Sequence, residues 1–253
     1  MRTIINHISP YVLIIILLFL FHSSNLLFAQ TTTTIGFSAG YGMLNMKEVN
    51  SDLKDTYQLL QSANIPASSP EEIEGGLFVD GNFLVRLEKI SLGASVSYIT
   101  GKGNLTYSDF SGSIEESYDA STIEIMGIIG TNVPFNQTVS LSLRGYAGYG
   151  IASANHIGRI NFFASPQDNI NVTNDVSGGY FAARIQGGIE ILVEPVMLNF
   201  SLAYRIANAG KLKGDMTENG ISFSNMGVRN VRGGDIEFDY SGITFMAGIQ
   251  FQL

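Results

Sequence analysis

The chain has 253 residues, a formal net charge of −8 and no cysteine, which excludes disulfide bonds and an N-terminal lipid thioether. An acidic chain without a basic stripe is also a poor candidate for binding nucleic acid. Apolar residues make up 45% of the chain and charged residues only 14%, whereas about a quarter of a typical soluble protein is charged. This composition is unusual for a secreted soluble protein.

The first residues, 1–29, are predicted to be a signal peptide. Arg2 is followed by an apolar run from Tyr11 to Phe21, and then by the small residue Ala29, which is the order of features in a secretory signal. The run is shorter than the roughly 20 residues that cross a bilayer as a helix, so we interpret it as a cleaved signal and not as a membrane anchor. The expected mature domain is 30–253.

Eight segments after the signal alternate between apolar and polar residues. From Val139 to Tyr149, for example, Leu141 and Leu143 alternate with Ser142 and Arg144. Successive side chains of a strand point to opposite faces, so this period of two predicts strands with one apolar face. The segments cover 35–42, 77–88, 90–98, 123–130, 139–149, 180–191, 196–205 and 240–253.

The connections between these segments alternate between short and long. Short turns are predicted near 88–89, 132–136 and 194–195, and long loops near 44–74, 101–119, 152–178 and 207–238. Such alternation is expected of an outer-membrane barrel. An apolar face of about ten residues, tilted as in such barrels, covers roughly 25 Å, the height of the membrane's apolar band. The last apolar-face residues before the long loops are tyrosines, which favour the membrane interface: Tyr41, Tyr98, Tyr149 and Tyr204.

The sequence therefore predicts an all-β fold, an eight-stranded antiparallel transmembrane β-barrel with short periplasmic turns and long extracellular loops. The alternative is a soluble sandwich or a lipocalin-like barrel whose apolar face points inward. The final stretch, YSGITFMAGIQFQL (Tyr240 to Leu253), alternates until the chain stops. Hydrocarbon cannot hydrogen-bond an open sheet edge, so the last strand is expected to pair with the first and close the barrel.

With this terminal strand, the chain resembles the eight-stranded outer-membrane barrels typified by outer membrane proteins A and X, especially the stand-alone barrels of Bacteroidetes-type bacteria. In that family the last strand carries a signal for the barrel-assembly machinery, a glycine followed by spaced aromatics. Gly248, Phe251 and Leu253 match that spacing, with Leu253 in place of the usual final aromatic. The resemblance implies a monomer in the bacterial outer membrane, surrounded by lipid and lipopolysaccharide, inserted by the assembly machinery and holding no cofactor.

Charged residues share the polar, inward face of the predicted strands. A barrel of eight strands has room inside only for side chains, and enclosed charges must pair because an unpaired buried charge is very costly. We therefore expect a plugged, salt-bridged interior; the alternative is a narrow gated channel or carrier for small solutes or small hydrophobic molecules. Which acid meets which arginine is left open. The charged residues on this face are Asp80, Arg86, Glu88, Glu124, Arg144, Arg184, Glu190 and Arg205.

The first long loop contains the chain's helix signal, from Asn45 to Gln61. Val49, Leu53 and Leu60, with Tyr57 or Thr56 between them, form an apolar stripe at helical spacing. Asn45 and Glu48 have the spacing of a capping box. The helix is interpreted as one that packs on neighbouring loops; the alternatives are a lid over the barrel mouth or a helix on the lipid interface.

Catalytic and metal-binding patterns are weak. His156 is the one histidine after the signal; Ser153 is near it, and the sequence places no acid beside it. A nucleophile, base and orienting group therefore cannot be identified, and we expect no enzyme. The stretch DMTENG begins like a calcium loop at Asp215 but has Met226 where a bidentate glutamate is needed. The function expected is that of a structural or surface-interaction protein acting through its extracellular loops.

Overall fold

The structure is a computed structural model that describes residues 31–87 and 90–253. The signal-peptide prediction for 1–29 and the turn at Glu88 and Lys89 lie outside the described residues. Residues Thr32–Leu253 form one compact unit.

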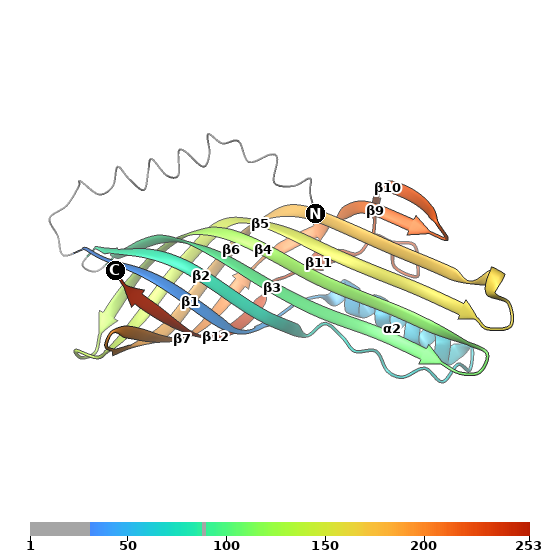
Figure 1. Cartoon of the computed structure of the whole chain (residues 1–253), viewed down its shortest axis with the longest axis horizontal. Helices are drawn as coiled ribbons and strands as arrows, with labels where there is room; N and C mark the ends of the chain where they lie inside the picture. The colour runs from blue at the N-terminus through green and yellow to red at the C-terminus, as the bar shows by residue number, and fades with distance from the viewer. Residues whose placement is uncertain (1–30, 88–89) are drawn as a thin grey trace. The chain divides into compact units, whose positions relative to one another are not determined.

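Eight antiparallel strands close into a ring, which confirms the fold class predicted from the sequence. Each strand pairs with the next in chain order, and the last of them pairs with both the seventh and the first. The ring therefore has no open edge. Its members, shown in Figure 1, are β1 (Thr31–Met43), β2 (Gly75–Leu87), β3 (Ile90–Ser108), β4 (Gly112–Pro134), β5 (Val139–Phe162), β6 (Ile170–Val193), β7 (Val196–Ile206) and β12 (Gly242–Gln252).

The seam between β1 and β12 explains the terminal strand. Thr34 lies opposite Gln252 and Gly42 opposite Thr244 in an unbroken antiparallel register. The backbone N–H of Leu253 donates to the carbonyl of Thr33 at 2.9 Å. β12 thus extends to Gln252 and the backbone of Leu253 is still bonded to the first strand, because both edges must be paired for the ring to close.

Two of the predicted long loops are wrong, since 101–119 and 152–178 are mostly strand. The β3–β4 pairing runs without interruption from Ile90 opposite Thr131 to Ser108 opposite Ser113. The β5–β6 hairpin is equally long and turns around a short 3-10 helix, η3 (Pro166–Asp168). Figure 1 shows β3 to β6 continuing well past the ends of β1, β2 and β12.

The loops were mispredicted because the apolar face changes sides along these strands. On β3 the outer face is apolar as far as Tyr98 and polar from Thr100 onward, while the buried inner face changes from Ser97 to Ile99 and then Leu105. A search for one continuous apolar face stops at this inversion. The same change occurs on the other long strands, whose extensions bury Tyr118, Ala120, Ala154 and Val176 inside and expose Asp119 and Asp175 outside.

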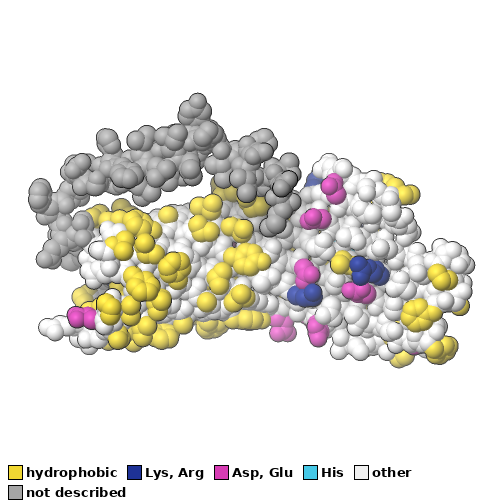
Figure 2. All heavy atoms as spheres, in the orientation of Figure 1, with side chains coloured by type: hydrophobic (Ala, Val, Ile, Leu, Met, Phe, Trp, Pro, Cys, Tyr) yellow, Lys and Arg dark blue, Asp and Glu magenta, His cyan; other side chains and the backbone are white. Residues whose placement is uncertain are grey.

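Figure 2 shows the result on one face of the molecule. Hydrophobic side chains gather over the part of the wall that carries the short turns, and charged side chains lie over the extended part. We use the term extension for the part of β3 to β6 beyond the inversion, together with the segments packed on it.

The fourth predicted loop, 207–238, contains additional strands. β9 (Lys213–Glu218) pairs with β6, and β10 (Ile221–Gly227) pairs with β9, so this hairpin widens the sheet of the extension. β8 (Asn208–Lys211) and β11 (Glu237–Asp239) form a separate two-stranded sheet.

The predicted helix of the first loop is present as α2 (Lys47–Ser62). Its Val49 and Leu53 are fully buried, and Leu53 lies against Gly103 on the inner face of β3. The helix also contacts β11. It therefore packs on strands of the extension, and not on neighbouring loops as interpreted from the sequence, and lies along the inner side of the extension (Figure 1). Within the described residues, none of the helices is long and apolar enough to cross a membrane.

The predicted capping box of this helix is wrong. α2 begins after Met46, and no side chain caps its first turn. Asn45 instead donates to the Asp239 carboxylate at 2.6 Å, and Glu48 accepts the backbone N–H of Glu237 at 2.6 Å. Both side chains are engaged by the segment that precedes β12, because tertiary partners compete with local capping.

Candidate functional site

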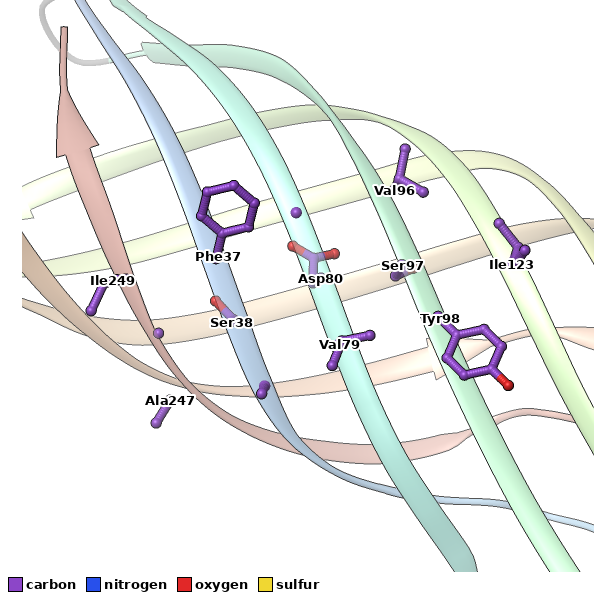
Figure 3. Close-up of a pocket in the computed structure, with 13 residues that line it drawn as sticks. Phe37, Ser38, Val79, Asp80, Val96, Ser97, Tyr98, Ile123, Ala247 and Ile249 are labelled. Atoms are coloured by element: carbon purple, nitrogen blue, oxygen red, sulfur yellow. The ribbon is translucent and has the colours of Figure 1, made fainter.

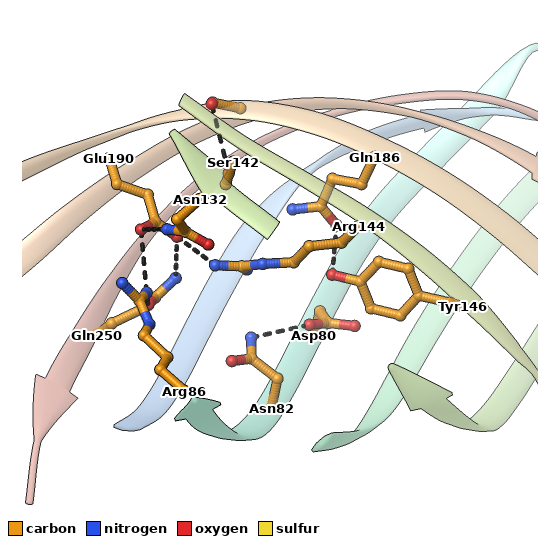
Figure 4. Close-up of polar contacts among 11 residues, drawn as sticks. Asp80, Asn82, Arg86, Asn132, Ser142, Arg144, Tyr146, Gln186, Glu190 and Gln250 are labelled. Carbon is orange, nitrogen blue, oxygen red and sulfur yellow. Dashed lines mark hydrogen bonds and ion pairs between the residues drawn. The ribbon is translucent and has the colours of Figure 1, made fainter. Parts of the chain in front are cut away.

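The interior of the ring is crossed by three tiers of polar contacts, which begin near the short turns at Glu190. No part of the Glu190 side chain is exposed. Its carboxylate accepts from Arg86 at 3.0 Å and also from Arg144. Asn132 and Gln250 donate to the same carboxylate at 2.5 and 3.4 Å. Two guanidinium groups therefore share one buried acid, as Figure 4 shows.

The middle tier is built around Arg184. It donates to Asp80 at 2.7 Å, and its guanidinium lies 3.8 Å from the centre of the Tyr146 ring. Phe78 lies on the same cation at 5.4 Å. An aromatic face attracts a cation most strongly where water is excluded, so Arg184 is held by one charge and by two rings.

The upper tier is built around Glu124. Its carboxylate accepts from Tyr180 at 2.7 Å and from Ser97 at 3.3 Å, and it lies 3.8 Å from Arg205. Arg205 also donates to the carbonyl of Tyr240. A buried acid is thus matched by a cation and by two hydroxyl donors.

The seven predicted inner-face charged residues that the structure describes all lie within these tiers, and the structure assigns their partners. The sequence could not assign them, since most of the pairs join strands that are not neighbours in the ring and Arg144 and Glu190 are not directly opposite in their register. Tyr146, Tyr180, Asn132 and Gln250 also belong to the tiers. They were missed as members, although their alternation with outward apolar residues placed them on the same face. Arg144, Arg184 and Arg205 are among the largest fully buried side chains of the described chain.

A substitution at Gly150 tests the packing of the upper tier. A Cβ added there would lie 2.4 Å from the Tyr180 ring. Gly150→Ala is therefore expected to displace Tyr180 from Glu124 and to lower the free energy of unfolding by about 1–3 kcal/mol, measured as a lower urea midpoint in detergent micelles. Gly187→Ala is the control, because no atom lies within 4 Å of its added Cβ. An unchanged midpoint in Gly150→Ala would contradict the tight packing.

The outer wall carries the predicted interface tyrosines. Tyr41, Tyr98, Tyr149 and Tyr204 are all exposed on it, each within a few residues of the end of its strand's apolar outer face. Of the predicted assembly signal, Phe251 and Leu253 are exposed at the end of β12, and Gly248 lies opposite Ser38 at the seam.

A shallow groove marks the outer wall across β12, β1, β2 and β3. Figure 3 shows Phe37 on β1 and Tyr98 on β3, with Val79 of β2 between them and Ile249 of β12 on the other side of Phe37. The small residues Ala39, Gly81 and Ala247 also line the groove. The lining is largely apolar, so the groove suits hydrocarbon rather than a polar ligand.

A second polar cluster lies in the extension, between α2 and the inner faces of β4, β5 and β6. Tyr118 donates to Asp52 of α2 at 2.6 Å and lies 3.5 Å from Glu116. The His156 ring stacks on Tyr118 with centroids 4.4 Å apart, and its Nε2 lies 3.7 Å from Glu116. Asn174 contacts Nδ1 of the same ring at 3.0 Å. All five side chains are buried. We call Asp52, Glu116, Tyr118 and His156 the α2 cluster.

The two acids of this cluster respond differently to their surroundings. Burial raises the pKa of Asp52 to about 6, although hydrogen bonds from Tyr118 and from the backbone of Val231 oppose this shift. Burial also disfavours the charged form of Glu116, but His156 and the other polar neighbours outweigh it and hold the pKa of Glu116 below its usual value. Burial and the two nearby acids raise the pKa of Tyr118 well above its usual value.

The sequence-based view of His156 was wrong in one respect, because an acid does lie beside it. Glu116 is forty residues away in the chain and reaches His156 through the β4–β5 pairing, where Tyr118 is opposite His156. A sequence signal for Asp52 did exist, since it follows Val49 by three residues and so shares the buried stripe of α2. Within the described ranges, no group of three or more metal-ligating side chains is placed to hold a metal ion.

A closed ring of eight antiparallel strands, with an apolar outer wall and a polar interior, defines the class of this protein as an eight-stranded β-barrel. No protein-family model matches the sequence, and no curated protein matches it. The class assignment rests on the strand pairing itself.

The solved structures that are similar to the chain include the following three. Neisserial surface protein A has 9% identity and a TM-score of 0.40, over 88% of this chain and 97% of that chain. The attachment invasion locus protein Ail of Yersinia pestis, in complex with the heparin analogue sucrose octasulfate, has 10% identity and a TM-score of 0.36, over 88% and 97%. The outer membrane protease OmpT from Escherichia coli has 8% identity and a TM-score of 0.30, over 91% and 100%.

Proposed function

We propose that the protein is an integral barrel of the bacterial outer membrane that acts as a structural or surface-interaction protein through its extracellular extension. The observation that carries the proposal is the inversion of the apolar face. Below Tyr98 the outer face of β3 presents Leu92 and Val96 to its surroundings, and above Tyr98 it presents Lys102 and Asn104. Water favours an apolar interior and hydrocarbon an apolar exterior, so the inversion supports a change of solvent from lipid to water at this level.

The filled interior favours this function over a channel. Three tiers of buried charge and aromatic rings cross the ring in succession, centred on Glu190, Arg184 and Glu124. Eight strands leave room inside only for side chains. A solute would have to displace paired charges in all three tiers, at a cost that grows with each pair broken.

The ends of the extension supply the proposed interaction surface. Phe110, at the β3–β4 tip, is 94% exposed, and Phe163 at the β5–β6 tip is also exposed. Ile221 and Phe223 are exposed on the β9–β10 hairpin. Apolar side chains that project from a polar surface often mark contact sites for a partner. The extension therefore supports contact with another macromolecule better than catalysis, and we propose no enzymatic role for His156.

Planar-bilayer recording tests the absence of conduction. Residues 30–253, inserted into a bilayer, are expected to give no steady single-channel current, because the interior tiers lie within the ring itself. Deletion of 45–65 is expected to remain silent, since removal of α2 leaves the three tiers in place. Protease protection of the membrane-embedded strands would show that silent protein had inserted.

Either of two results would contradict parts of this proposal. A steady current from the intact protein would favour the narrow channel over the plugged barrel. Failure to partition into bilayers at all, with a soluble folded barrel remaining, would contradict the membrane location.

A further inference from the structure

We propose that the α2 cluster is a proton-binding site that controls how firmly α2 is seated on the inner face of the extension. A proton held on Asp52 keeps the helix in place, and its loss loosens the helix and uncovers the apolar side chains beneath it. The inference goes beyond the proposed function, because it holds whether or not the barrel conducts and whatever the partner is.

Asp52 joins α2 to two other segments of the extension. One carboxylate oxygen accepts the Tyr118 hydroxyl of β4 at 2.6 Å, and the other accepts the backbone N–H of Val231 at 2.8 Å. Asp52 is 2% exposed and lies between Val49 and Leu53 on the buried stripe. The state of this one carboxyl group therefore acts on both of these hydrogen bonds at once.

The cluster is arranged so that two acids compete for one donor. The Tyr118 oxygen lies 2.6 Å from Asp52 and 3.5 Å from Glu116, but a tyrosine hydroxyl has one hydrogen to donate. Two carboxylates that share a buried site disfavour each other's ionisation. A proton on Asp52 removes that repulsion and supplies a second donor. When the proton is lost, two negatively charged carboxylates compete for the one hydrogen of the Tyr118 hydroxyl.

The other charged groups around Asp52 do not replace this proton, because they are engaged elsewhere. His156 on β5 faces Glu116. Arg232, from the segment after β10, pairs with Asp55 at 2.8 Å on the exposed side of α2. The remaining neighbours also have partners. Lys54 pairs with Glu72. On β11, the backbone N–H of Glu237 donates to Glu48, and the Asp239 carboxylate accepts from Asn45.

The pH range follows from the direction of the shift. The pKa of Asp52 is raised to about 6 from an ordinary value of 3.8, so the folded site binds a proton more tightly than the unfolded chain does. The stabilisation is full below the ordinary value and is lost as pH rises through about 6. The pKa of Glu116 is lowered, so this acid stays charged over that range and keeps opposing the ionisation of Asp52.

Spin-label distances test the inference, because the chain contains no cysteine and accepts a designed pair. Labels at Ser51→Cys on α2 and Thr106→Cys on β3 occupy exposed positions. The full protein in lipid vesicles is expected to give a narrow distance distribution at about pH 4.5 and a broader one, with longer distances, at about pH 7.5. The change should have its midpoint near pH 6, the pKa of Asp52.

Variants separate this site from a general effect of pH. Asp52→Asn is expected to keep the narrow distribution at both pH values, because it cannot ionise. Asp55→Asn, the matched control on the same helix, should retain the full pH response. Distances that are equal at both pH values in the parent, or a full response in Asp52→Asn, would overturn the proposal.

Two further variants keep the test valid if Asp52→Asn fails to fold. Burial is the main cause of the raised pKa of Asp52, and the charge of Glu116 adds to it; Glu116→Gln removes that charge, so the midpoint should move to lower pH. Tyr118→Phe removes the donor that stabilises the Asp52 carboxylate, so the midpoint should move to higher pH. Midpoints that stay fixed, or that move together in one direction, would also overturn the proposal.

Discussion

Replacing Glu190 by glutamine is expected to lower the free energy of unfolding by about 3–5 kcal/mol, because breaking a buried ion pair leaves an uncompensated charge. Arg86 and Arg144 both pair with this carboxylate, and Glu190 is fully buried. The measurement is a urea titration in detergent micelles, with strand content followed by circular dichroism. A shifted midpoint with an unchanged slope would report lost stability alone.

Two comparisons make this expectation specific to the buried charge. Glu194→Gln removes an acid at the exposed β6–β7 turn and should leave the midpoint unchanged. Adding Arg144→Met to Glu190→Gln should recover part of the loss, since it removes the fully buried cation that the first change leaves unpaired. A midpoint equal to the parent's in Glu190→Gln alone would show that the lower tier contributes nothing to stability.

Placing an arginine at Ile185 is expected to destabilise the membrane-inserted protein by about 2–4 kcal/mol, the cost of a cation facing lipid near the middle of a bilayer. Ile185 is 68% exposed on the outer wall, near the middle of the apolar stretch of β6. The change adds no volume to the interior, so its effect reports the solvent around the wall. Reversible folding into lipid vesicles, followed by urea titration, measures it.

Ser177→Arg is the matched control for Ile185→Arg. Ser177 is exposed on the same face of β6, beyond the inversion, where the proposal places water. Its substitution should leave the midpoint within about 0.5 kcal/mol of the parent, as surface changes usually do. Equal losses from both arginines would contradict a lipid-to-water boundary between the two positions.

Much of the ring was predictable because an apolar outer wall and a polar interior require a strict alternation along each strand. Where the outer face must be apolar and the interior polar, the alternation at Leu141 and Leu143 against Ser142 and Arg144 is unambiguous. The extension was not predictable in this way, since its pattern has the opposite sense. Ile99 and Leu105 are inward, and Lys102 is outward. The strand continues past the inversion, but its apolar residues move from the outer face to the inner face there.

The sequence predicted many of the residues that belong to the candidate sites, but not how these residues contact one another. Parity along each strand places Arg86, Arg144 and Glu190 on the inner face, but nothing in the sequence says that two arginines meet one acid. The α2 cluster was even harder to predict from the sequence. His156 and Glu116 come together through strand pairing in a region interpreted as loop. Asp52 is on α2, which precedes β4 and β5 in the chain by two and three strands. Such contacts depend on register and packing, which alternation alone does not encode.

In the proposed outer-membrane location, the inversion of the apolar face also determines how deeply the barrel is immersed. A shift of β4 by two residues toward the short turns would carry Ser121 and Asp119 toward hydrocarbon, while a shift the other way would lift Ile123 into water. The four long strands are hydrogen-bonded to one another, so all of them would have to move together and their costs would add. The level on the barrel at which lipid meets water is therefore fixed in this location, and a bilayer of different thickness must deform to match it.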